Sequence, residues 1–476
     1  MNISTLDQFD EKAADLIIAF PKNKKDNELV RKFTDLYNED DFTAEAKETI
    51  YLYQKNGLNK ILLLGLGEIK DQPRSAAYFR SCIFQNKKKL NKTLAVLVSH
   101  LDDYHVFNAV NGVMIGLKKN GVFKQEKEKS PVENLIFITN QKNHHKVIEE
   151  AKQYTETQLE LMHLVDMPSN IKTPEYIGQM VLDSARQYGY KAEVLNKTQL
   201  EKLGLKALLS VGQGSVNPPV LIVAEYKPDV PDGTLKTIGL VGKGISFDTG
   251  GISIKPSANM GYMKSDMGGA AAVIGTIELA AKLKLNAHII AIIPSAENSV
   301  DALSIRPGDI IGSYSGKSIE VIDTDAEGRL ILADGLAYLL KNYKPEYIVD
   351  IATLTGSIIQ TLGYHAAGLF TQNDELAQMM SEAGETVFER VWRLPVWDDY
   401  MGDMQSDMAD IKNLSGKPVA GAITAAKFVE YFTENHDKWA HLDIAGVAFS
   451  DSEFTKQRAA TGFGIRLLYE FIKKLQ

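Results

Sequence analysis

The segment TIGLVGKGISFDTGG, residues 237–251, decides the fold of this chain. An apolar run from Thr237 to Val241 leads directly into glycines, Lys243 and then Asp248. A short β-branched run bounded by glycine is typical of a buried strand. Polar residues that follow such a strand lie at its carboxyl end, where open α/β sheets bind their ligands. The segment therefore predicts a strand with a functional site at its end.

Apolar runs of the same kind alternate with longer amphipathic stretches along the chain. They occupy residues 60–65, 93–98, 134–139, 220–224, 237–241, 288–293 and 347–351. Strands that alternate with helices build mostly parallel sheets with helices on their faces. We therefore predict an α/β fold.

The length of 476 residues suits roughly two domains. A charged helical stretch, residues 145–164, is followed by Pro168 and Pro174, which mark a break before a new helix. We predict an N-terminal α/β domain of residues 1–155 and a C-terminal domain of residues 156–476. Each is expected to contain a mostly parallel sheet flanked by helices.

The composition excludes several classes of protein. Lys and Arg number 53 against 61 Asp and Glu, a net charge of −8 that disfavours a general nucleic-acid binder. The single cysteine, Cys82, has no partner for an internal disulfide, and the first residues lack the features of a signal peptide. Charged residues interrupt the most apolar stretch, residues 269–295, so no membrane helix is predicted. We expect a soluble, cytoplasmic protein.

The segment GSYSGKS, residues 312–318, resembles a phosphate-binding loop only superficially. Three residues separate its glycines instead of four, and the residues that follow alternate with the period of a strand. We predict a hairpin turn here, and the segment gives nucleotide hydrolysis little support.

Four acidic residues occur in glycine-rich segments at the ends of predicted strands or helices: Asp248, Asp266, Asp325 and Glu327. Lys243, Lys255 and Arg329 accompany them. Any one of these acids alone is better explained as a surface turn or a helix cap. Four together offer the hard oxygen ligands that suit a pair of divalent cations, whose charge would neutralise them.

Longer motifs carry a resemblance to a known family. The run from Val241 to Asp248 with Lys255 and Asp266, followed by DTDAEGRL at 323–330, resembles the leucyl aminopeptidase family of dimetal peptidases, also called cytosol aminopeptidases. ATLTG at 352–356 and WAHLDIAG at 439–446 extend the resemblance over residues 160–476. It implies a catalytic C-terminal domain, whereas the N-terminal half is similar only in broad pattern and is expected to be macro-domain-like.

The resemblance also implies a ligand set. One metal would be bound by Lys243, Asp248, Asp266 and Glu327, and the other by Asp248, Asp325 and Glu327. Asp248 and Glu327 would therefore bridge the two ions, which are expected to be Zn, Mn or Mg. A lysine binds metal only when neutral, so Lys243 would need a lowered pKa, which two adjacent cations favour.

The expected reaction follows from the family. A hydroxide that bridges the metals attacks the first peptide carbonyl, and one metal holds the free α-amine of the substrate. Lys255 stabilises the oxyanion. Arg329 holds a bicarbonate ion that acts as the general base, although an ion-pair role at a helix end is its alternative.

The pocket for the first side chain is implied by family position. Its expected residues are Met263, Thr353, Leu354, Gly356, Ala445 and Ala448. This apolar set favours leucine-like or methionine-like side chains, although Met263 also fits an ordinary core residue. Two positions depart from the family pattern, since Asp323 and Asp166 stand where Asn is usual.

The resemblance finally implies a homo-hexamer that acts on peptides with a free N-terminus, with the N-terminal domain serving assembly and access. Two other functions are considered. A dipeptidase with the same metal centre would fail on longer peptides. A non-enzymatic, DNA-associated or regulatory protein would bind DNA in a salt-sensitive manner.

Overall fold

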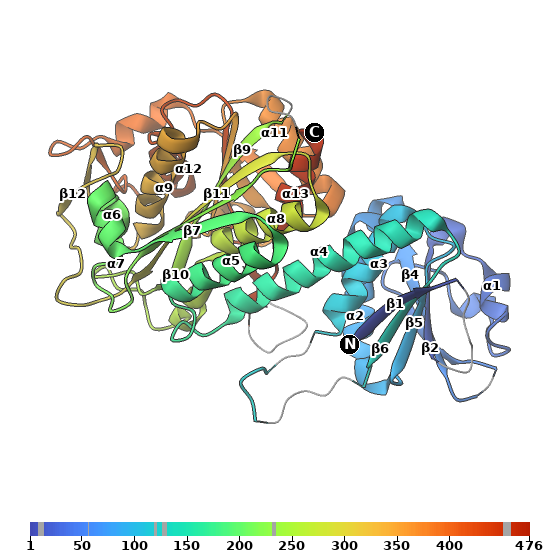
Figure 1. The fold of residues 1–476 in the computed structure, drawn as a ribbon. Helices are drawn as coiled ribbons and strands as arrows, with labels where there is room; N and C mark the ends of the chain where they lie inside the picture. Colours follow the sequence, from blue (N-terminus) through green and yellow to red (C-terminus); the bar gives the residue numbers. More distant parts are fainter. Residues whose placement is uncertain (8–13, 56, 119–120, 126–130, 231–234, 451–457) are drawn as a thin grey trace. The chain divides into compact units, whose positions relative to one another are not determined.

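The computed structural model describes residues 1–7, 14–55, 57–118, 121–125, 131–230, 235–450 and 458–476. These residues form two compact units (Figure 1). Of the described residues, those up to 159 form unit 1 and those from 160 onward form unit 2, so the division falls inside α4 (Lys142–Asp166).

Unit 1 is built on a sheet of six strands in the order β1-β6-β5-β2-β4-β3. All its neighbouring strands run parallel except β3, which is antiparallel to β4. The strands are β1 (Asn2–Leu6), β2 (Asp15–Pro21), β3 (Thr49–Tyr53), β4 (Lys60–Gly67), β5 (Thr93–Leu97) and β6 (Asn134–Ile138).

The two faces of this sheet are covered separately, because successive side chains of a strand point to opposite faces. Ile17 belongs to the core beneath α2 (Ser75–Asn86), α3 (Asp103–Gly116) and the first half of α4. Its neighbour Ile18 belongs to the core on the other face, together with Val30 of α1 (Asn27–Arg31) and Phe42.

Unit 2 is built on a mixed sheet of nine strands among the described residues. The order is β16-β15-β18-β14-β9-β11-β8-β7, and β10 pairs with β11. The strands are β7 (Lys191–Leu195), β8 (Val220–Tyr226), β9 (Thr237–Gly242), β10 (Gly244–Asp248), β11 (His288–Asn298), β14 (Tyr347–Ala352), β15 (Ala367–Phe370), β16 (Val391–Leu394) and β18 (Trp439–Asp443). The central strands β18, β14, β9 and β11 are parallel, whereas β8 runs antiparallel to β11. The prediction of an α/β fold with mostly parallel sheets is confirmed.

Helices cover both faces of this sheet (Figure 1). One face carries α5 (Pro174–Tyr188), α8 (Gly268–Leu283), α11 (Asp374–Val387) and α13 (Ile465–Lys474), and the other α7 (Lys206–Gly212), α9 (Glu327–Tyr343) and α12 (Gly421–Glu430). The first turn of α8 touches β14 so closely that a Cβ atom on Gly269 would lie 2.0 Å from the carbonyl oxygen of Ile351. Only glycine permits this approach, which brings the start of α8 to the sheet.

The predicted break after α4 is confirmed by the local hydrogen bonds. Thr173 caps α5, since its side chain accepts a hydrogen bond from the backbone N–H of Tyr176, and Pro174 occupies the first turn. Gly189 ends the helix at a φ of 79°.

Smaller elements complete unit 2. They are α6 (Lys197–Leu203), α10 (Gly356–Leu362), β12 (Ile310–Gly312), β13 (Ser318–Glu320), β17 (Ile411–Lys412), β19 (Phe449–Ser450) and β20 (Ala459–Ala460). Because β12 and β13 pair antiparallel, residues 312–318 form the predicted hairpin turn. Among the described residues, no helix combines the length and the apolar character that a membrane crossing requires.

Candidate metal centre

The carboxyl ends of the parallel strands bring the predicted ligands to one edge of the sheet in unit 2. Lys243 follows β9 directly, and Asp248 is the last residue of β10. Asp266 follows η5, a 3₁₀ helix of Met260–Ser265, and precedes α8. Asp325 stands just before α9, and Glu327 is the first residue of that helix.

The side chains of these residues meet. Asp248, Asp325 and Glu327 each offer a carboxylate oxygen, and the three oxygens lie within 4.8 Å of one another. The Nζ atom of Lys243 lies 2.7 Å from Oδ2 of Asp266 and 2.9 Å from Oε1 of Glu327. The structure thus brings together all five residues that the sequence assigns to the metals.

Lys255 lies on the same cluster. Its Nζ atom is 2.8 Å from Oδ2 of Asp248 and also forms an ion pair with Asp325. About a fifth of its side chain is exposed, 21%, whereas that of Lys243 is 3% exposed. Lys255 is therefore the cation of the cluster that faces the open side.

Neighbouring groups fix the orientation of the acids. Oδ1 of Asp248 accepts hydrogen bonds from the backbone of Gly250 and from Nδ2 of Asn298, each at 2.8 Å. The hydroxyl of Thr353 donates to Oδ1 of Asp266 at 2.7 Å, and its carbonyl accepts from Lys243. Asn298 was not predicted, although it is the last residue of β11, and a polar residue at the end of an apolar strand was the signal that identified Asp248.

Gly328 makes room for the buried lysine. A Cβ atom at this position would lie 2.6 Å from Nζ and 2.5 Å from Cε of Lys243. These distances are shorter than van der Waals contact, so a side chain here displaces the amine. The glycine of the DTDAEGRL motif is therefore part of the site's geometry.

The cluster carries more negative than positive charge. Burial and the nearby carboxylates of Asp248 and Glu327 together raise the pKa of Asp325 to about 7. Burial also raises the pKa of Asp266 and of Glu327. For Lys243, burial favours the neutral amine, but the carboxylates of Asp266, Glu327 and Asp248 outweigh this effect and raise its pKa.

These residues fit a pair of divalent cations. When all four acids are ionised, they carry two negative charges more than Lys243 and Lys255 neutralise. Oε2 of Glu327 is buried and has no hydrogen-bond partner among the described residues, so an acceptor is left over at the centre of the cluster. Hard carboxylate oxygens in this number are the ligands that such ions prefer.

Arg329 lies two residues after Glu327 in α9 and is buried. Its Nη1 atom donates to the carbonyl oxygen of Asn413 at 2.7 Å, while Nε has no hydrogen-bond partner among the described residues. Burial lowers its pKa to about 10. A buried guanidinium with a spare donor fits a small anion. Asn413 was missed because nothing in its local sequence links it to position 329.

A cavity of about 530 Å³ adjoins the acids. Five residues of the predicted pocket line it: Met263, Thr353, Leu354, Gly356 and Ala445. Met260 and Phe449 add to its apolar wall. Ala448 is buried and is not among the residues that line the cavity; it packs so close to Gly268 that a Cβ atom on Gly268 would stand 3.0 Å from the Ala448 Cβ.

The loop that follows β14 is held by a buried carboxylate. Oδ1 of Asp443 accepts from the backbone N–H of Leu354 at 3.1 Å, and Oδ2 accepts from the hydroxyl of Thr355 at 2.7 Å. Asp323, the first departure from the family pattern, lines the cavity and accepts from the backbone of Asp325 through Oδ1 at 2.8 Å. Its carboxylate thereby orients the backbone beside a candidate ligand.

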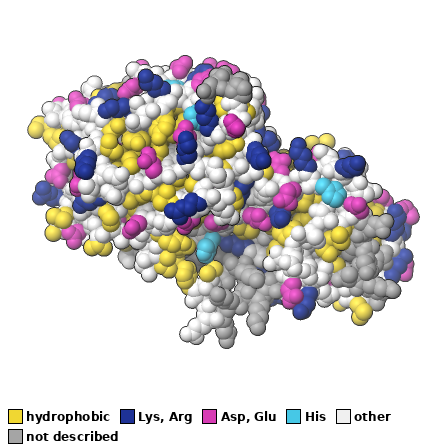
Figure 2. All heavy atoms as spheres, viewed as in Figure 1, with side chains coloured by type: hydrophobic (Ala, Val, Ile, Leu, Met, Phe, Trp, Pro, Cys, Tyr) yellow, Lys and Arg dark blue, Asp and Glu magenta, His cyan; other side chains and the backbone are white. Residues whose placement is uncertain are grey.

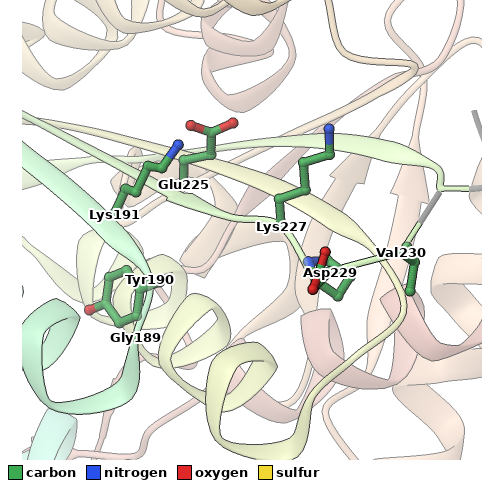
Figure 3. Close-up of a pocket in the computed structure, with 8 residues that line it drawn as sticks. Gly189, Tyr190, Lys191, Glu225, Lys227, Asp229 and Val230 are labelled. Carbon is green, nitrogen blue, oxygen red and sulfur yellow. The ribbon is translucent and has the colours of Figure 1, made fainter. Parts of the chain in front are cut away.

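A larger cavity, of about 750 Å³, lies elsewhere on unit 2, at the ends of β7 and β8 (Figure 3). Its charged side chains are Lys191, Glu225, Lys227 and Asp229, and the ring of Tyr190 points away from them. Glu225 is also engaged by Nε2 of His288 at 2.8 Å. Size alone does not make this cavity a site, because its charges balance and no group of three ligands converges there among the described residues.

The fold and the site together define a class of protein. A carboxylate-rich cluster that fits two divalent cations, beside a cavity with apolar walls, is typical of a metal-dependent hydrolase. A model of the cytosol aminopeptidase family, catalytic domain, matches residues 161–469.

Individual relatives agree with this class over the whole chain. The chain is 40% identical over 500 residues to a probable cytosol aminopeptidase of Chloroherpeton thalassium, with 96% of each chain covered. It is also 40% identical over 464 residues to a protein of the same description from Chlorobium phaeobacteroides, covering 91% of this chain and 90% of the other. This chain therefore belongs to the cytosol aminopeptidase family, which confirms the resemblance seen in the sequence and supports a metallo-aminopeptidase activity.

Solved structures show the same fold. A tomato leucine aminopeptidase mutant superposes with a TM-score of 0.87 at 31% identity, covering 100% of this chain and 96% of the other. The bottromycin maturation enzyme BotP in complex with Mn has a TM-score of 0.85 at 29% identity, covering 97% of this chain and 100% of the other.

Proposed function

We propose that this protein is an aminopeptidase that removes the first residue from peptides with a free N-terminus and prefers leucine-like or other apolar first residues. One observation carries the proposal. The carboxylates of Asp248, Asp325 and Glu327 converge within 4.8 Å beside a cavity whose far wall is apolar. A site of this kind joins hydrolytic chemistry to a pocket for one apolar side chain.

In this proposal Lys243, Asp248, Asp266 and Glu327 bind one metal ion, and Asp248, Asp325 and Glu327 bind the other. The cations would supply what the side chains lack, a water ionised between them near neutral pH and a Lewis acid for the peptide carbonyl. Their charge would also favour the neutral amine of Lys243, which the surrounding carboxylates alone disfavour. The ions are Zn, Mn or Mg, and BotP is described in complex with Mn.

Lys255 is proposed to stabilise the oxyanion that forms on the attacked carbonyl. Its ammonium group lies against Asp248 and Asp325 and is partly exposed to the cavity. These carboxylates outweigh the effect of burial and raise its pKa, so Lys255 stays charged at neutral pH. A charged donor held in place before the reaction begins is worth several kcal/mol to such a step, about 3–4 in comparable sites.

Arg329 is proposed to hold a bicarbonate ion that acts as the general base. Its unused Nε donor and its position on the cavity wall support this role. No histidine lines the cavity among the described residues, so a small anion would fill a role that no nearby imidazole takes.

A leucyl substrate with a chromophoric leaving group tests the activity. The purified protein supplied with Mn or Zn is expected to release the chromophore, and the N-acetylated form of the same substrate is expected to stay intact because it lacks the free amine. Cleavage of the blocked substrate contradicts the aminopeptidase assignment. Peptides of four or more residues, offered in the same assay, separate an aminopeptidase from a dipeptidase.

Substitution of Lys255 tests its role within that activity. Lys255→Ala is expected to lower kcat by about 100-fold to 1000-fold, because the oxyanion loses its charged donor. The KM of the leucyl substrate should change much less, since the apolar wall is intact. A kcat within threefold of the wild type, about 0.7 kcal/mol in the barrier, refutes the role.

We further propose that the protein acts as a homo-hexamer in the cytoplasm, with unit 1 serving assembly and access to the site. The names of its relatives, probable cytosol aminopeptidases, support the location. Light scattering on the purified protein tests the assembly, and a mass other than six chains contradicts it.

A further inference from the structure

Lys172 is a completely buried lysine outside the metal centre. It lies in the turn between α4 and α5. Its Nζ atom donates to the carbonyl oxygen of Val165 at 3.0 Å and to that of Lys264 at 2.6 Å. Burial lowers its pKa to about 7, so holding the charged ammonium group in this position costs free energy. Both acceptors are backbone carbonyls, which indicates that Lys172 works as a cross-link between two chain segments.

The cross-link is reciprocal. Lys264, which is half-buried in η5, donates from its own Nζ atom to the carbonyl oxygen of Asp166 at 2.7 Å. Each lysine therefore bonds the backbone of the segment that carries the other. Asp166 extends the connection, since its Oδ1 atom accepts from the backbone N–H of Ala460 at 2.8 Å.

The segments held in this way form the apolar wall of the cavity. Met260 and Met263 belong to η5, and both line the cavity. Tyr262 of the same helix packs its ring against that of Phe449 at 5.7 Å between centroids. Phe449 lines the cavity from β19, where its register partner is Ala460 of β20. Both parts of the wall are therefore fastened to residues 165–172.

We propose that Lys172 and Lys264 form a clamp that sets the position of η5, and that this position determines how well the cavity discriminates large apolar first residues from small ones. The inference rests on the proposed aminopeptidase function and adds two positioning residues to it. Neither lysine touches the substrate. Their effect passes through the backbone at Lys264 to Met263 on one side and to Asp266 on the other.

The size of the effect follows from the chemistry of apolar pockets. One methylene more or less in such a pocket changes binding by about 10-fold or more. A small displacement of Met263 should therefore strongly weaken the binding of a leucyl side chain. An alanyl side chain hardly reaches the wall and should be almost insensitive. The ratio of kcat/KM for leucyl over alanyl substrates therefore measures the effect of the clamp on the cavity.

The experiment compares three single variants of the full chain supplied with Mn, together with the double variant of Lys172 and Lys264. Lys172→Met keeps most of the length of the side chain and removes both hydrogen bonds of its Nζ atom, and Lys264→Met removes only the reciprocal bond. Lys427→Met is the matched control. Lys427 is also buried, but it lies in α12 and pairs with Glu430 of that helix and with Asp398 of the 3₁₀ helix Asp398–Met404, away from both segments. Thermal unfolding, with and without Mn, is measured on each variant.

We expect the leucyl-to-alanyl ratio to fall about fivefold to tenfold in Lys172→Met and less in Lys264→Met, through a higher KM for the leucyl substrate. The double variant should lose less than the product of the two effects, because both lysines hold one element. Lys427→Met should lower the unfolding temperature and leave the ratio unchanged.

An unchanged ratio in both clamp variants overturns the inference while the wild type remains an aminopeptidase. If Lys172→Met does not fold, Lys264→Met alone decides, because its side chain is only half-buried. A wild type that is inactive on both substrates refutes the proposed function instead. The two failures are therefore distinguishable.

Discussion

Lys243 shows how a single side chain ties the stability of the protein to its site. Its amine is buried between the carboxylates of Asp266 and Glu327. Lys243→Met is expected to lower the free energy of unfolding by about 3–5 kcal/mol in the presence of a chelator, because two buried acids lose their counter-charge.

Chemical denaturation measures this difference. Adding Mn should narrow it, since cations neutralise the same carboxylates that the lysine neutralised. Equal stability of variant and wild type in chelator contradicts the view that Lys243 compensates buried charge.

A substitution at Gly328 has opposite effects on the site and on α9, the helix that carries this glycine. Gly328→Ala favours the helical state of α9 by about 1 kcal/mol, because alanine is the better helix former. The added Cβ nevertheless meets Nζ of Lys243 at 2.6 Å and forces the amine away from Asp266 and Glu327. We expect turnover to fall about tenfold or more while the unfolding temperature changes little.

Activity assays and thermal unfolding of the same preparation give both quantities. Gly335→Ala, in the same helix, serves as the control, because the three atoms nearest to its added Cβ belong to the side chains of Val241 and Pro294 and lie at 3.0 Å and beyond. If both variants keep full turnover, the close contact between position 328 and Lys243 does not matter for activity, and the prediction is wrong.

The sequence predicted the candidate site better than its supporting residues, for a physical reason. Lys243, Asp248, Asp325 and Glu327 occur in two compact motifs at strand and helix ends, where local sequence already fixes their geometry. Asn298 and Asn413 reach the site only after strands and loops distant in the chain have packed. Ala448 shows the converse: family position predicted it in the pocket, but it packs against Gly268 and is not among the lining residues.

Among the elements, the predicted strands were those with continuous apolar runs. The runs at 220–224, 237–241, 288–293 and 347–351 are β8, β9, β11 and β14. A buried run does not encode strand direction, because both faces are covered either way, and so the antiparallel pairing of β8 had no sequence signal. The short strand β10 was missed for its length, although it carries Asp248.

The start of α13 depends on a carboxylate from another element. Oε2 of Glu389 accepts from the backbone N–H groups of Gly464 and Leu467, both at 2.9 Å. Burial raises the pKa of Glu389 to about 7, although these two hydrogen bonds lower it. Its pKa in the folded state thus exceeds its usual value, so this residue contributes stability below about pH 4 that is lost as the pH rises toward 7.

Glu389→Gln keeps the accepting oxygen and removes the charge. At pH 8 the variant should be more stable than the wild type by about 1 kcal/mol, since solvent screens the half-buried Glu389 in part, and at pH 4 the two should be equally stable. Denaturant unfolding at both pH values gives the comparison. A variant that is less stable at pH 8 shows that the ionised carboxylate at the helix start is favourable and contradicts the prediction.

For the whole molecule, the net charge of −8 argues against a nucleic-acid function. On the face shown in Figure 2, basic and acidic side chains are interspersed over both units. We expect no salt-sensitive DNA binding tighter than about 100 μM at physiological ionic strength, since clustered positive charge drives such binding. Fluorescence anisotropy with a labelled duplex measures it, and tighter, salt-dependent binding favours the DNA-associated alternative.

Metal binding offers a test on the whole molecule that does not depend on turnover. Ions that bind only the folded protein add to its stability by mass action, about 1.4 kcal/mol for each tenfold increase in concentration above the dissociation constant. The unfolding temperature in chelator should therefore be the lowest, and it should rise steadily with added Mn. Glu327→Gln should flatten this rise, because the proposal makes Glu327 a ligand of both ions. Lys427→Met should keep it, since that lysine lies outside the centre. A wild-type unfolding temperature that is independent of Mn would contradict the metal centre itself, whatever the activity assay shows.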